Sequence, residues 1–364
     1  MLVSRRLFIG GAAAGALSSW SVAAQNSKLS VPQIDSVTLQ VIVDNATFGP
    51  FLPDRILPGL KIQRANPDAG KSRMTHSPLR SEFGLSILSE SKQGEQTRHV
   101  LVDFGYSAEV LSHNMALLGI DAEKIDATVL SHGHLDHYGG FSGLFNSRPD
   151  HENRGMPLYI GGEEAFCERL ALIGSPPPLM GTLDRTGLAK AGFEVRMAPE
   201  PMVIADHAFT TGVIPLQSFE RAAIPTQMRP GVGCDASELA DTKRKAKQLP
   251  DDGEHELATA YHVKGMGLVV VASCSHRGVL NSIRRAQEIS GVEKILAVVG
   301  GFHLVRPRTE DEAKRTVAEM MRIDPTYVVP MHCSGDVFVD EAMRLMPQKV
   351  VRSYVGTRLT FGAT

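Results

Sequence analysis

The alternation of hydrophobic and polar residues predicts an early strand and a β/α succession after it. Val37, Leu39, Val41 and Val43 occupy every second position before Asp44, so one face of an extended segment is apolar. Further apolar strands are predicted at 84–88, 99–103, 127–130, 158–160, 268–272, 295–299 and 327–330. Apolar residues at helical spacing predict helices at 109–118, 163–172 and 279–289, with a short helix after Gly140. This order of elements is typical of an α/β fold.

One stretch interrupts the succession. Residues 46–78 contain five prolines and three glycines, which predicts a long irregular loop. Nothing between residues 25 and 364 has the composition of a flexible linker, so we expect one domain over 25–364.

The first 24 residues resemble a twin-arginine export signal. The segment 4–9 (SRRLFI) precedes a run of small and apolar residues that ends at Val22-Ala23-Ala24. The apolar run is too short to cross a bilayer core of about 30 Å, so we expect cleavage after Ala24 and no stable membrane anchor. The resemblance implies recognition by the twin-arginine machinery and a periplasmic location. That route is expected to carry folded proteins whose cofactors are already inserted.

Composition excludes some classes of partner. The chain has 38 Lys and Arg residues against 40 Asp and Glu residues, and no basic stripe of the kind that nucleic-acid binding needs. Its four cysteines, Cys167, Cys234, Cys274 and Cys333, are widely spaced. We therefore predict no obligatory disulfide, and no oligomeric state is indicated.

The polar region 221–253 is rich in turns and contains four basic residues close together. We predict that this region, including Lys243, forms a solvent-exposed face; the alternative, which the spacing does not support, is an active-site flap that recognises an acidic group. Asp252, Glu254 and His255 follow it, and we expect them to be surface groups as well.

The strand predicted at 127–130 leads into a cluster of metal-ligand residue types. His132 and His134 alternate, so in an extended segment both side chains can reach one ion. Asp136 and His137 come next, and suit a second ion about 3.5–4 Å from the first. A polar surface turn is the alternative, but four such residues within six positions after a buried strand rarely serve packing.

Three further strands each end near a histidine. His276 follows the strand at 268–272, His303 the strand at 295–299 and His332 the strand at 327–330. Open α/β sheets bind their ligands at the carboxyl ends of the strands. We therefore expect all three side chains at one functional site.

These motifs resemble those of the metallo-β-lactamase superfamily. The likeness is greatest to the branch named after 7,8-dihydropterin-6-methyl-4-(β-D-ribofuranosyl)aminobenzene-5'-phosphate synthase, and it runs from Val37 to about Thr360. It implies a four-layered αβ/βα sandwich with metals at the strand ends. It also implies that Asp103, after the strand at 99–103, orients the ligands through hydrogen bonds; an ordinary turn aspartate is the alternative. The metal ligands that we assign are His132, His134, Asp136, His137, His276 and His332.

Two departures from the wider superfamily bear on the ligands. No histidine in a threonine- and glycine-rich context precedes the strand at 268–272, and no bridging aspartate stands near Cys274. Either Cys274 supplies a thiolate in its place, which favours zinc, or Cys274 is a small buried residue and His276 binds the metal. His303 is a ligand, a proton donor or an anion-binding group, and we rank substrate contact or acid catalysis first.

The resulting hypothesis is hydrolysis assisted by one or two metal ions, with zinc first and iron or manganese as alternatives. A metal-activated water attacks an ester, lactone, amide or phosphoester of a small molecule, and Asp136 accepts or orients its proton. We do not extend methanopterin synthesis to an exported protein. Two other classes stay open: an iron-dependent oxidoreductase of the same fold, acting on persulfides, and a non-catalytic periplasmic ligand-binding protein.

Overall fold

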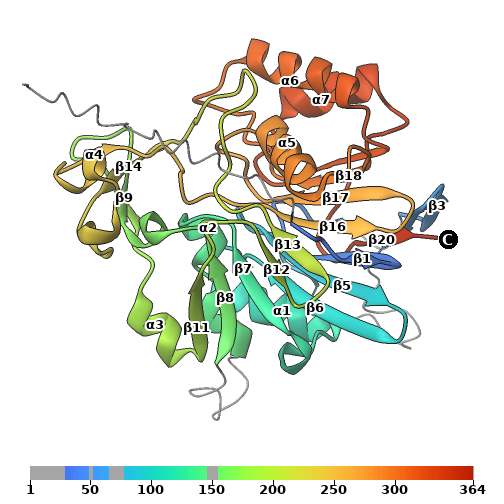
Figure 1. Cartoon of the computed structure of the whole chain (residues 1–364), viewed down its shortest axis with the longest axis horizontal. Helices are drawn as coiled ribbons and strands as arrows, with labels where there is room; N and C mark the ends of the chain where they lie inside the picture. Colours follow the sequence, from blue (N-terminus) through green and yellow to red (C-terminus); the bar gives the residue numbers. More distant parts are fainter. Residues whose placement is uncertain (1–28, 49–51, 65–77, 146–154, 364) are drawn as a thin grey trace, which may run out of the picture.

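Two large sheets stack face to face in a computed structural model that describes residues 29–48, 52–64, 78–145 and 155–363 (Figure 1). In spatial order the strands of the first sheet are β11 (Phe193–Met197), β8 (Met156–Ile160), β7 (Ala127–Leu130), β6 (Gln96–Val102), β5 (Ser86–Gln93), β2 (Ser36–Val43), β20 (Arg358–Gly362), β4 (Leu60–Gln63) and β3 (Arg55–Leu57). The second sheet has β12 (Met202–Ile204), β13 (Ala208–Thr210), β16 (Thr259–Val263), β17 (Gly267–Ala272), β18 (Ile295–Gly300) and β19 (Tyr327–Pro330), with β1 (Gln33–Ile34) beside β16. The predicted export signal lies outside the described residues.

Helices cover the outer faces of both sheets. The helices of the described residues are α1 (Ala108–Leu118), α2 (Leu135–Tyr138), α3 (Arg185–Lys190), α4 (Asp241–Arg244), α5 (Val279–Ser290), α6 (Glu310–Ile323) and α7 (Asp336–Leu345), of which α2 and α4 lie away from these outer faces. Figure 1 shows α5, α6 and α7 above the second sheet and α1 and α3 below the first. Short 3₁₀ turns occur at Ala122–Lys124, Phe141–Phe145, Glu163–Phe166 and Ala236–Glu238. None of the described helices is long and apolar enough to cross a membrane.

Three buried clusters hold these layers together. Between the sheets, Val41 and Val129 of the first pack with Val269, Val299 and Val329 of the second. One outer cluster joins α1 and α3 to the first sheet, and the other joins α5, α6 and α7 to the second. The α/β class and the predicted four-layered αβ/βα sandwich are confirmed. That residues 25–364 form one domain stays a prediction.

Capping residues set the ends of the longer helices. α6 begins at Thr309 with a capping box, in which the Thr309 side chain accepts from the Glu312 amide and the Glu312 side chain accepts from the Thr309 amide. α1 is capped by Ser107 and ends at Gly119 in the left-handed conformation. The predicted helices at 109–118 and 279–289 thus match α1 and α5.

The prediction of an irregular loop over 46–78 was wrong for its middle part. β3 and β4 form a hairpin there, and β4 pairs with β20 at the edge of the first sheet. Leu60 and Ile62 are buried while Lys61 between them is exposed, which is the alternation of a strand. Pro58 and Gly59, which we took for interruptions, make the hairpin turn, with Gly59 at φ 72°.

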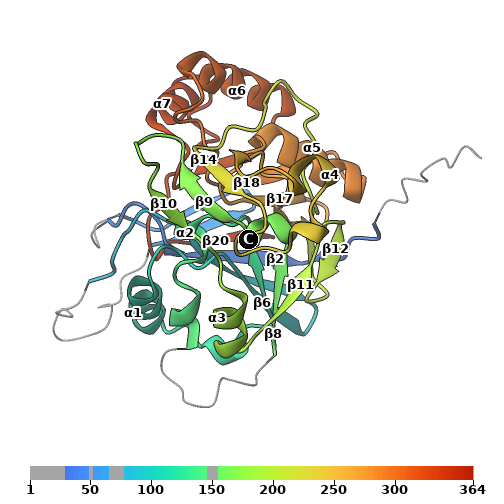
Figure 2. The same ribbon diagram turned by 90° about the vertical axis from the view of Figure 1, so that its left-hand side faces the viewer.

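The helix predicted at 163–172 was also wrong. Only Glu163–Phe166 forms a 3₁₀ turn, and β9 (Glu168–Ala171) follows it as a strand. β9 pairs with β14 (Thr226–Arg229) and β10 (Leu179–Gly181), and β14 pairs with β15 (Leu249–Pro250). This third, small sheet lies beside α2 (Figure 2). The conformation of β9 depends on its pairing with β14, which lies more than 50 residues away along the chain.

Candidate metal centre

The strands of both sheets deliver the candidate ligands to one place. β17, β18 and β19 run parallel in register, with Ala272 opposite Gly300 and Gly300 opposite Pro330, so their carboxyl ends lie level. β6 and β7 run parallel in the first sheet, and the loop after β7 leads into α2. Polar residues that follow each of these strands therefore converge at the joint edge of the two sheets.

Three histidines form the first candidate ion site. The ligand atoms of His132, His134 and His276 lie within 4.8 Å of one another. The His132 and His134 rings are 4.6 Å apart between centroids, and the His276 ring lies 4.8 Å from His132 and 4.7 Å from His134. Two sheets contribute to this trio, because His276 comes from the strand end of β17.

A carboxylate and two histidines form the second candidate ion site. The ligand atoms of Asp136, His137 and His332 also lie within 4.8 Å of one another. The Asp136 Oδ2 atom is 3.3 Å from His332 Nε2 and 3.6 Å from His137 Nε2. The His132 and His137 rings are 4.2 Å apart between centroids, so the two trios are neighbours.

The imidazole nitrogens that face the centre lack a hydrogen-bond partner among the described residues. The Nε2 atoms of His132, His137, His276 and His332 are buried and make no hydrogen bond to described residues. Buried polar atoms are rarely left unsatisfied, so four of them at one point indicate a missing ligand. Imidazole nitrogens together with one carboxylate are ligands that zinc, iron and manganese accept. The residues therefore fit two neighbouring metal ions.

Charge at the centre differs between the two trios. Burial, followed by the neighbouring histidines, holds the pKa values of His132 and His276 well below 6.5, so both are neutral and able to bind metal. Burial also lowers the pKa of His137, but Asp136 and Asp103 outweigh it and raise the value to about 9. His137 and His332 in turn outweigh burial and lower the pKa of Asp136 below 3.8. The second trio thus contains an ionised carboxylate, and its His137 must release a proton to bind a cation.

Asp103 fixes the histidine loop from behind. Its Oδ2 atom lies 2.7 Å from His137 Nδ1 and accepts a hydrogen bond from Ser131 Oγ at 2.7 Å, while Oδ1 accepts from the Ser131 amide. Ser131 Oγ is also 2.9 Å from His132 Nδ1. Asp103 is buried, has φ 59° and contacts the outer side of the ligands, as the orienting role implied.

His134 is held by the small third sheet. Its Nε2 atom is 3.1 Å from Thr226 Oγ1 on β14, and Thr226 Oγ1 donates to Asp251 Oδ2 at 3.3 Å. Asp251 also accepts from Arg169 Nε on β9 at 2.7 Å. The bond to Thr226 engages Nε2, which leaves His134 Nδ1 to bind an ion. Sequence reasoning missed Thr226, Asp251 and Arg169 because strand pairing between distant segments brings them to the site.

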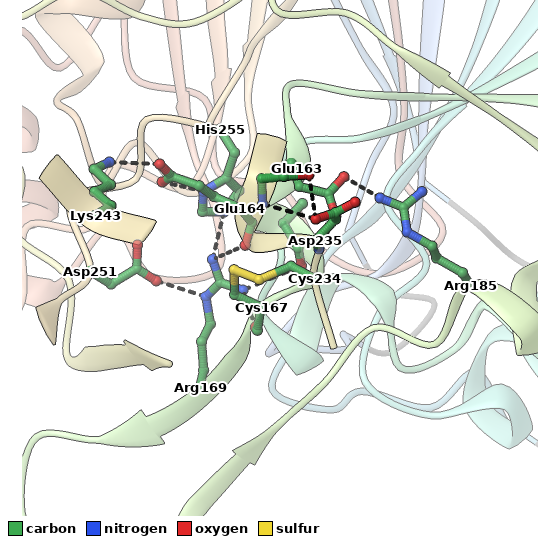
Figure 3. The surroundings of a disulfide bond; sticks show 12 residues. Glu163, Glu164, Cys167, Arg169, Arg185, Cys234, Asp235, Lys243, Asp251 and His255 are labelled. Carbon is green, nitrogen blue, oxygen red and sulfur yellow. Dashed lines mark hydrogen bonds and ion pairs between the residues drawn. A yellow bond between two sulfur atoms is a disulfide. The ribbon is translucent and has the colours of Figure 1, made fainter. Parts of the chain in front are cut away.

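The same sheet supports the backbone of the histidine loop. Arg169 Nη2 donates to the Glu164 carbonyl at 2.9 Å and lies 3.1 Å from His255 Nε2 (Figure 3). His255 Nε2 also accepts from the Gly133 amide at 3.1 Å. A Cβ atom at Gly133 would lie 2.2 Å from the Ala165 carbonyl oxygen, so only glycine fits there. His255 is buried, and the prediction that it is a surface group was wrong.

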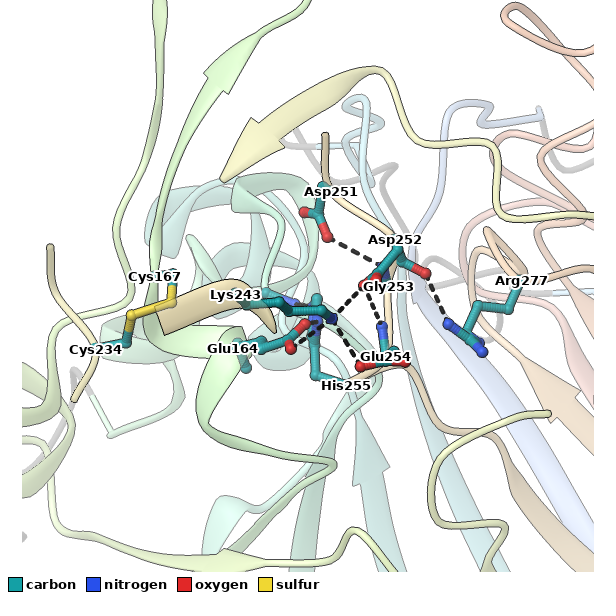
Figure 4. Close-up of polar contacts among 12 residues, drawn as sticks. Glu164, Cys167, Cys234, Lys243, Asp251, Asp252, Gly253, Glu254, His255 and Arg277 are labelled. Atoms are coloured by element: carbon teal, nitrogen blue, oxygen red, sulfur yellow. Dashed lines mark hydrogen bonds and ion pairs between the residues drawn. A yellow bond between two sulfur atoms is a disulfide. The ribbon is translucent and has the colours of Figure 1, made fainter. Parts of the chain in front are cut away.

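The predicted solvent-exposed position of Lys243 was wrong too. Its Nζ atom is buried and donates to Glu164 Oε1, Asp252 Oδ1 and Glu254 Oε2 at 2.7, 2.8 and 2.7 Å (Figure 4). Burial lowers the pKa of Lys243, but hydrogen bonds to the three carboxylates outweigh it and raise the value. The ammonium group lies among these carboxylates, so we assign no metal to them.

A disulfide joins Cys167, at the start of β9, to Cys234, after β14, which corrects the prediction that none is needed (Figure 3). The two cysteines are 67 positions apart, and the pairing of β9 with β14 brings them together. Cys274 and Cys333 are free thiols. The spacing of the four cysteines in the sequence does not indicate which two form the disulfide and which two remain free thiols.

Cys274, Cys333 and His303 lie beside the two trios. The sulfur atoms are 3.2 Å apart, and His303 Nδ1 is 3.6 Å from Cys274 Sγ. His303 Nε2 is buried without a partner, and the ring is 4.1 Å from that of His276. Cys274 is also within 4.8 Å of the ligand atoms of His132 and His137, so both Cys274 and His276 reach the centre.

His332 has outer partners at the end of β2. Asp44 Oδ1 accepts from the His332 amide at 2.9 Å, and Asn45 Oδ1 lies 3.1 Å from His332 Nδ1. Both residues directly follow a strong apolar strand, which is the signal that pointed to the histidines. Applied to β2, the same rule would have found them.

Comparison with known proteins agrees with this geometry. Residues 92–152, which contain β6, β7 and the histidine loop, match the family model described as the metallo-beta-lactamase superfamily. Over these residues the chain matches the metallo-beta-lactamase superfamily, which confirms the resemblance that the histidine motifs carry. Members of this superfamily generally bind metal ions, and most are metal-dependent hydrolases.

Two proteins of Methanocaldococcus jannaschii are similar in sequence. One is 7,8-dihydropterin-6-methyl-4-(beta-D-ribofuranosyl)-aminobenzene-5'-phosphate synthase, 28% identical over 289 residues, covering 76% of this chain and 92% of the relative. The other, MJ0448, is uncharacterised and 26% identical over 258 residues, covering 70% of this chain and 85% of the relative. The branch implied by the histidine motifs is therefore confirmed.

A solved structure supports the fold. Tm1679, described as a metal-dependent hydrolase of the beta-lactamase superfamily, superposes with a TM-score of 0.63 at 24% sequence identity. The match covers 88% of this chain and 98% of that chain. This metallo-beta-lactamase-fold protein therefore has the sandwich of its superfamily over most of its length.

Proposed function

We propose that this protein is an exported hydrolase that uses one or two metal ions, with zinc first, to activate water against a small-molecule substrate. The observation that carries the proposal is the convergence of four orphaned Nε2 atoms of His132, His137, His276 and His332 at the meeting point of both sheets. A non-catalytic ligand-binding protein has no need for two adjacent ion sites that open into a cavity. That cavity is lined by His134, Asp136, His276, His303 and His332 among others.

The site residues divide the chemistry between them. Ions bound by the two trios would lower the pKa of a coordinated water toward neutrality and polarise the oxygen under attack. Asp136 Oδ2 lies beside His137 and His332 and Asp136 lines the cavity, so we assign to it the role of accepting or orienting the proton of the attacking water. His303 lines the same cavity with its Nε2 atom unpartnered, and we assign it proton donation to the leaving group.

Elemental analysis of protein purified without added metal tests the proposal. We expect about two zinc ions per chain, with His134→Ala and His332→Ala each losing metal and metal-dependent ester or phosphoester hydrolysis. His113→Ala is the matched control, because His113 is a half-buried histidine on α1 whose Nε2 atom lies 2.8 Å from the Pro78 carbonyl and which does not line the cavity. Iron at about one per chain would instead favour the oxidoreductase, since a single iron is the alternative that these ligands accept. No bound metal in the unmodified protein would contradict both enzymatic functions.

Export to the periplasm is part of the proposal. The Cys167–Cys234 disulfide supports it, because disulfides persist in oxidising compartments and are rare in the cytosol. Cell fractionation should find the protein in the periplasm, and replacement of Arg5 and Arg6 by lysine should retain it in the cytoplasm. Periplasmic accumulation of that variant would contradict the twin-arginine route.

A further inference from the structure

The cavity beside the metal centre offers no positive side chain to a substrate. Its volume is about 190 Å³, and the described residues that line it include neither lysine nor arginine. The nearby guanidinium groups are bonded elsewhere: Arg169 to Asp251, Arg277 to the Ile214 and Asp252 carbonyls, and Arg308 to the Arg221 and His276 carbonyls. A phosphate group inside this cavity but outside the metal centre would therefore lose its hydration without gaining a lysine or arginine partner.

The outer wall of this cavity is apolar and exposed. Leu179 and Met180 of β10 are 62% and 42% exposed, and Phe83 opposite them is 60% exposed. β10 is seated firmly on α2, since a Cβ atom at Gly181 would lie 2.3 Å from the Tyr138 hydroxyl. A contiguous group of large exposed apolar side chains next to a reaction centre is a mark of a ligand-binding groove.

The apolar surface continues past Pro225. Pro225 lines the metal cavity and also a larger neighbouring hollow of about 840 Å³. Leu172, Ile173, Leu304 and Val305 line that hollow, and Ile173 is 81% exposed. The hollow is also lined by the charged residues Arg306, Arg308, Glu310 and Asp336. Ligand pockets commonly measure about 300–1,000 Å³, so the metal cavity alone holds only the part of a substrate around the scissile bond. For the remainder of the substrate, Pro225 and the apolar side chains of Leu172 and Ile173 offer a way into the hollow.

We infer that the substrate is an uncharged carboxylic ester whose apolar acyl chain extends from the metal centre past Pro225 over the β9–β10 hairpin. This rests on the proposed hydrolase function. In the reaction, water adds to the ester carbonyl carbon and the bond from that carbon to the alkoxy oxygen breaks. The products are the carboxylic acid and the alcohol, the alcohol taking the proton, and no oxidant or reductant takes part.

Four substrates with one chromophore test this inference on the metal-loaded protein: p-nitrophenyl acetate, butyrate, octanoate and phosphate. Each buried methylene contributes about 0.8 kcal/mol, so two of them suffice for about a tenfold gain. We expect kcat/KM to rise at least about tenfold from acetate to octanoate, and phosphate to be the poorest substrate. Equal kcat/KM along the ester series, or preferred hydrolysis of the phosphate, would overturn the inference and leave the proposed hydrolase standing.

Variants at the surface test where the acyl chain of the substrate lies. Ile173→Gln and Met180→Gln replace exposed side chains, so the fold tolerates them, and we expect each to lower the octanoate-to-acetate ratio of kcat/KM. Ile56→Gln on β3 is the matched control, because Ile56 is 73% exposed and lines neither cavity, and its ratio should stay unchanged. Equal ratios in all three variants would overturn the path past Pro225. Hydrolysis of none of the four substrates by a chain with full metal content would overturn the proposed function together with this inference.

Discussion

His137 Nδ1 lies 2.7 Å from Asp103 Oδ2, although 34 positions separate the two residues, and this contact ties a candidate ligand to the end of a neighbouring strand. Hydrogen bonds of this kind fix the orientation of a ligating imidazole and raise its basicity. The same carboxylate accepts from Ser131, so one buried side chain positions the whole loop after β7.

Asp103→Asn should weaken metal binding by about 10- to 100-fold, because the amide keeps the shape of the carboxylate but removes its charge behind His137. Titration with a chromophoric chelator measures the change. Asp126→Asn is the control, since Asp126 is an exposed strand-end aspartate that accepts from the His99 amide. An unchanged affinity in Asp103→Asn would show that Asp103 is only a turn residue.

His276→Ala should remove the ion held with His132 and His134, whereas Cys274→Ala should keep it. The reason is geometric: His276 Nε2 faces the centre without a partner, while Cys274 Sγ contacts both Cys333 and His303. Metal analysis of both variants decides between the two ligands. In the cobalt-substituted protein we expect no charge-transfer band from a thiolate, and a strong band that disappears in Cys274→Ala would contradict the assignment.

Loss of the disulfide should lower the free energy of unfolding by about 4 kcal/mol, since the bond closes a long loop in the unfolded chain. The test compares urea unfolding of the unmodified protein with that of the double variant Cys167→Ala, Cys234→Ala. Reductant should destabilise the unmodified protein and leave the double variant unchanged. If reductant destabilises both equally, the effect comes from other groups.

Lys243→Met should lower the free energy of unfolding by about 3 kcal/mol, because it leaves the buried Glu164 carboxylate without its cation. Lys245→Met is the control at an exposed position in the same segment. Urea unfolding at neutral pH measures both variants. Equal stability of the two variants would contradict the conclusion that the Lys243 cation stabilises the buried Glu164 carboxylate.

The pH dependence of stability should report on Glu164 as well. Burial raises the pKa of this carboxyl, but the nearby His255 ring and the hydrogen bond from Lys243 outweigh it and hold the pKa below 4.5. A depressed folded-state pKa contributes stability that is present above pH 4.5 and is lost as the pH falls through the folded value. In Glu164→Gln the decline of unfolding free energy below pH 4.5 should be shallower, and an identical decline would assign the acid sensitivity to other carboxylates.

The histidines at the strand ends of the second sheet were the easiest site residues to predict from sequence. His276 and His332 follow uninterrupted apolar strands, and parallel strands bring their carboxyl ends to one edge whatever the rest of the chain does. The sequence prediction was wrong around Glu168 and Lys243. Their surroundings depend on antiparallel pairing between distant segments, and a short segment such as Glu168–Ala171 has no pattern that separates strand from helix.

Polar residues in that region were the hardest to place. A run of lysines and acids is usually solvated, so nothing local distinguishes the buried Lys243 from its exposed neighbour Lys245. Lys243 is buried only because Glu164, Asp252 and Glu254 arrive around it from two other segments. The same holds for Cys167 and Cys234, whose bond is a result of the fold and has no signature in spacing.

Each candidate trio draws its members from both sheets: His132 and His134 follow β7 while His276 follows β17, and Asp136 and His137 face His332 after β19. An ion held by either trio is therefore a cross-link between the two halves of the sandwich, and its binding free energy adds to the cohesion of the folded chain. Chelation would then do more than stop turnover. It would also destabilise the packing of the two sheets against each other.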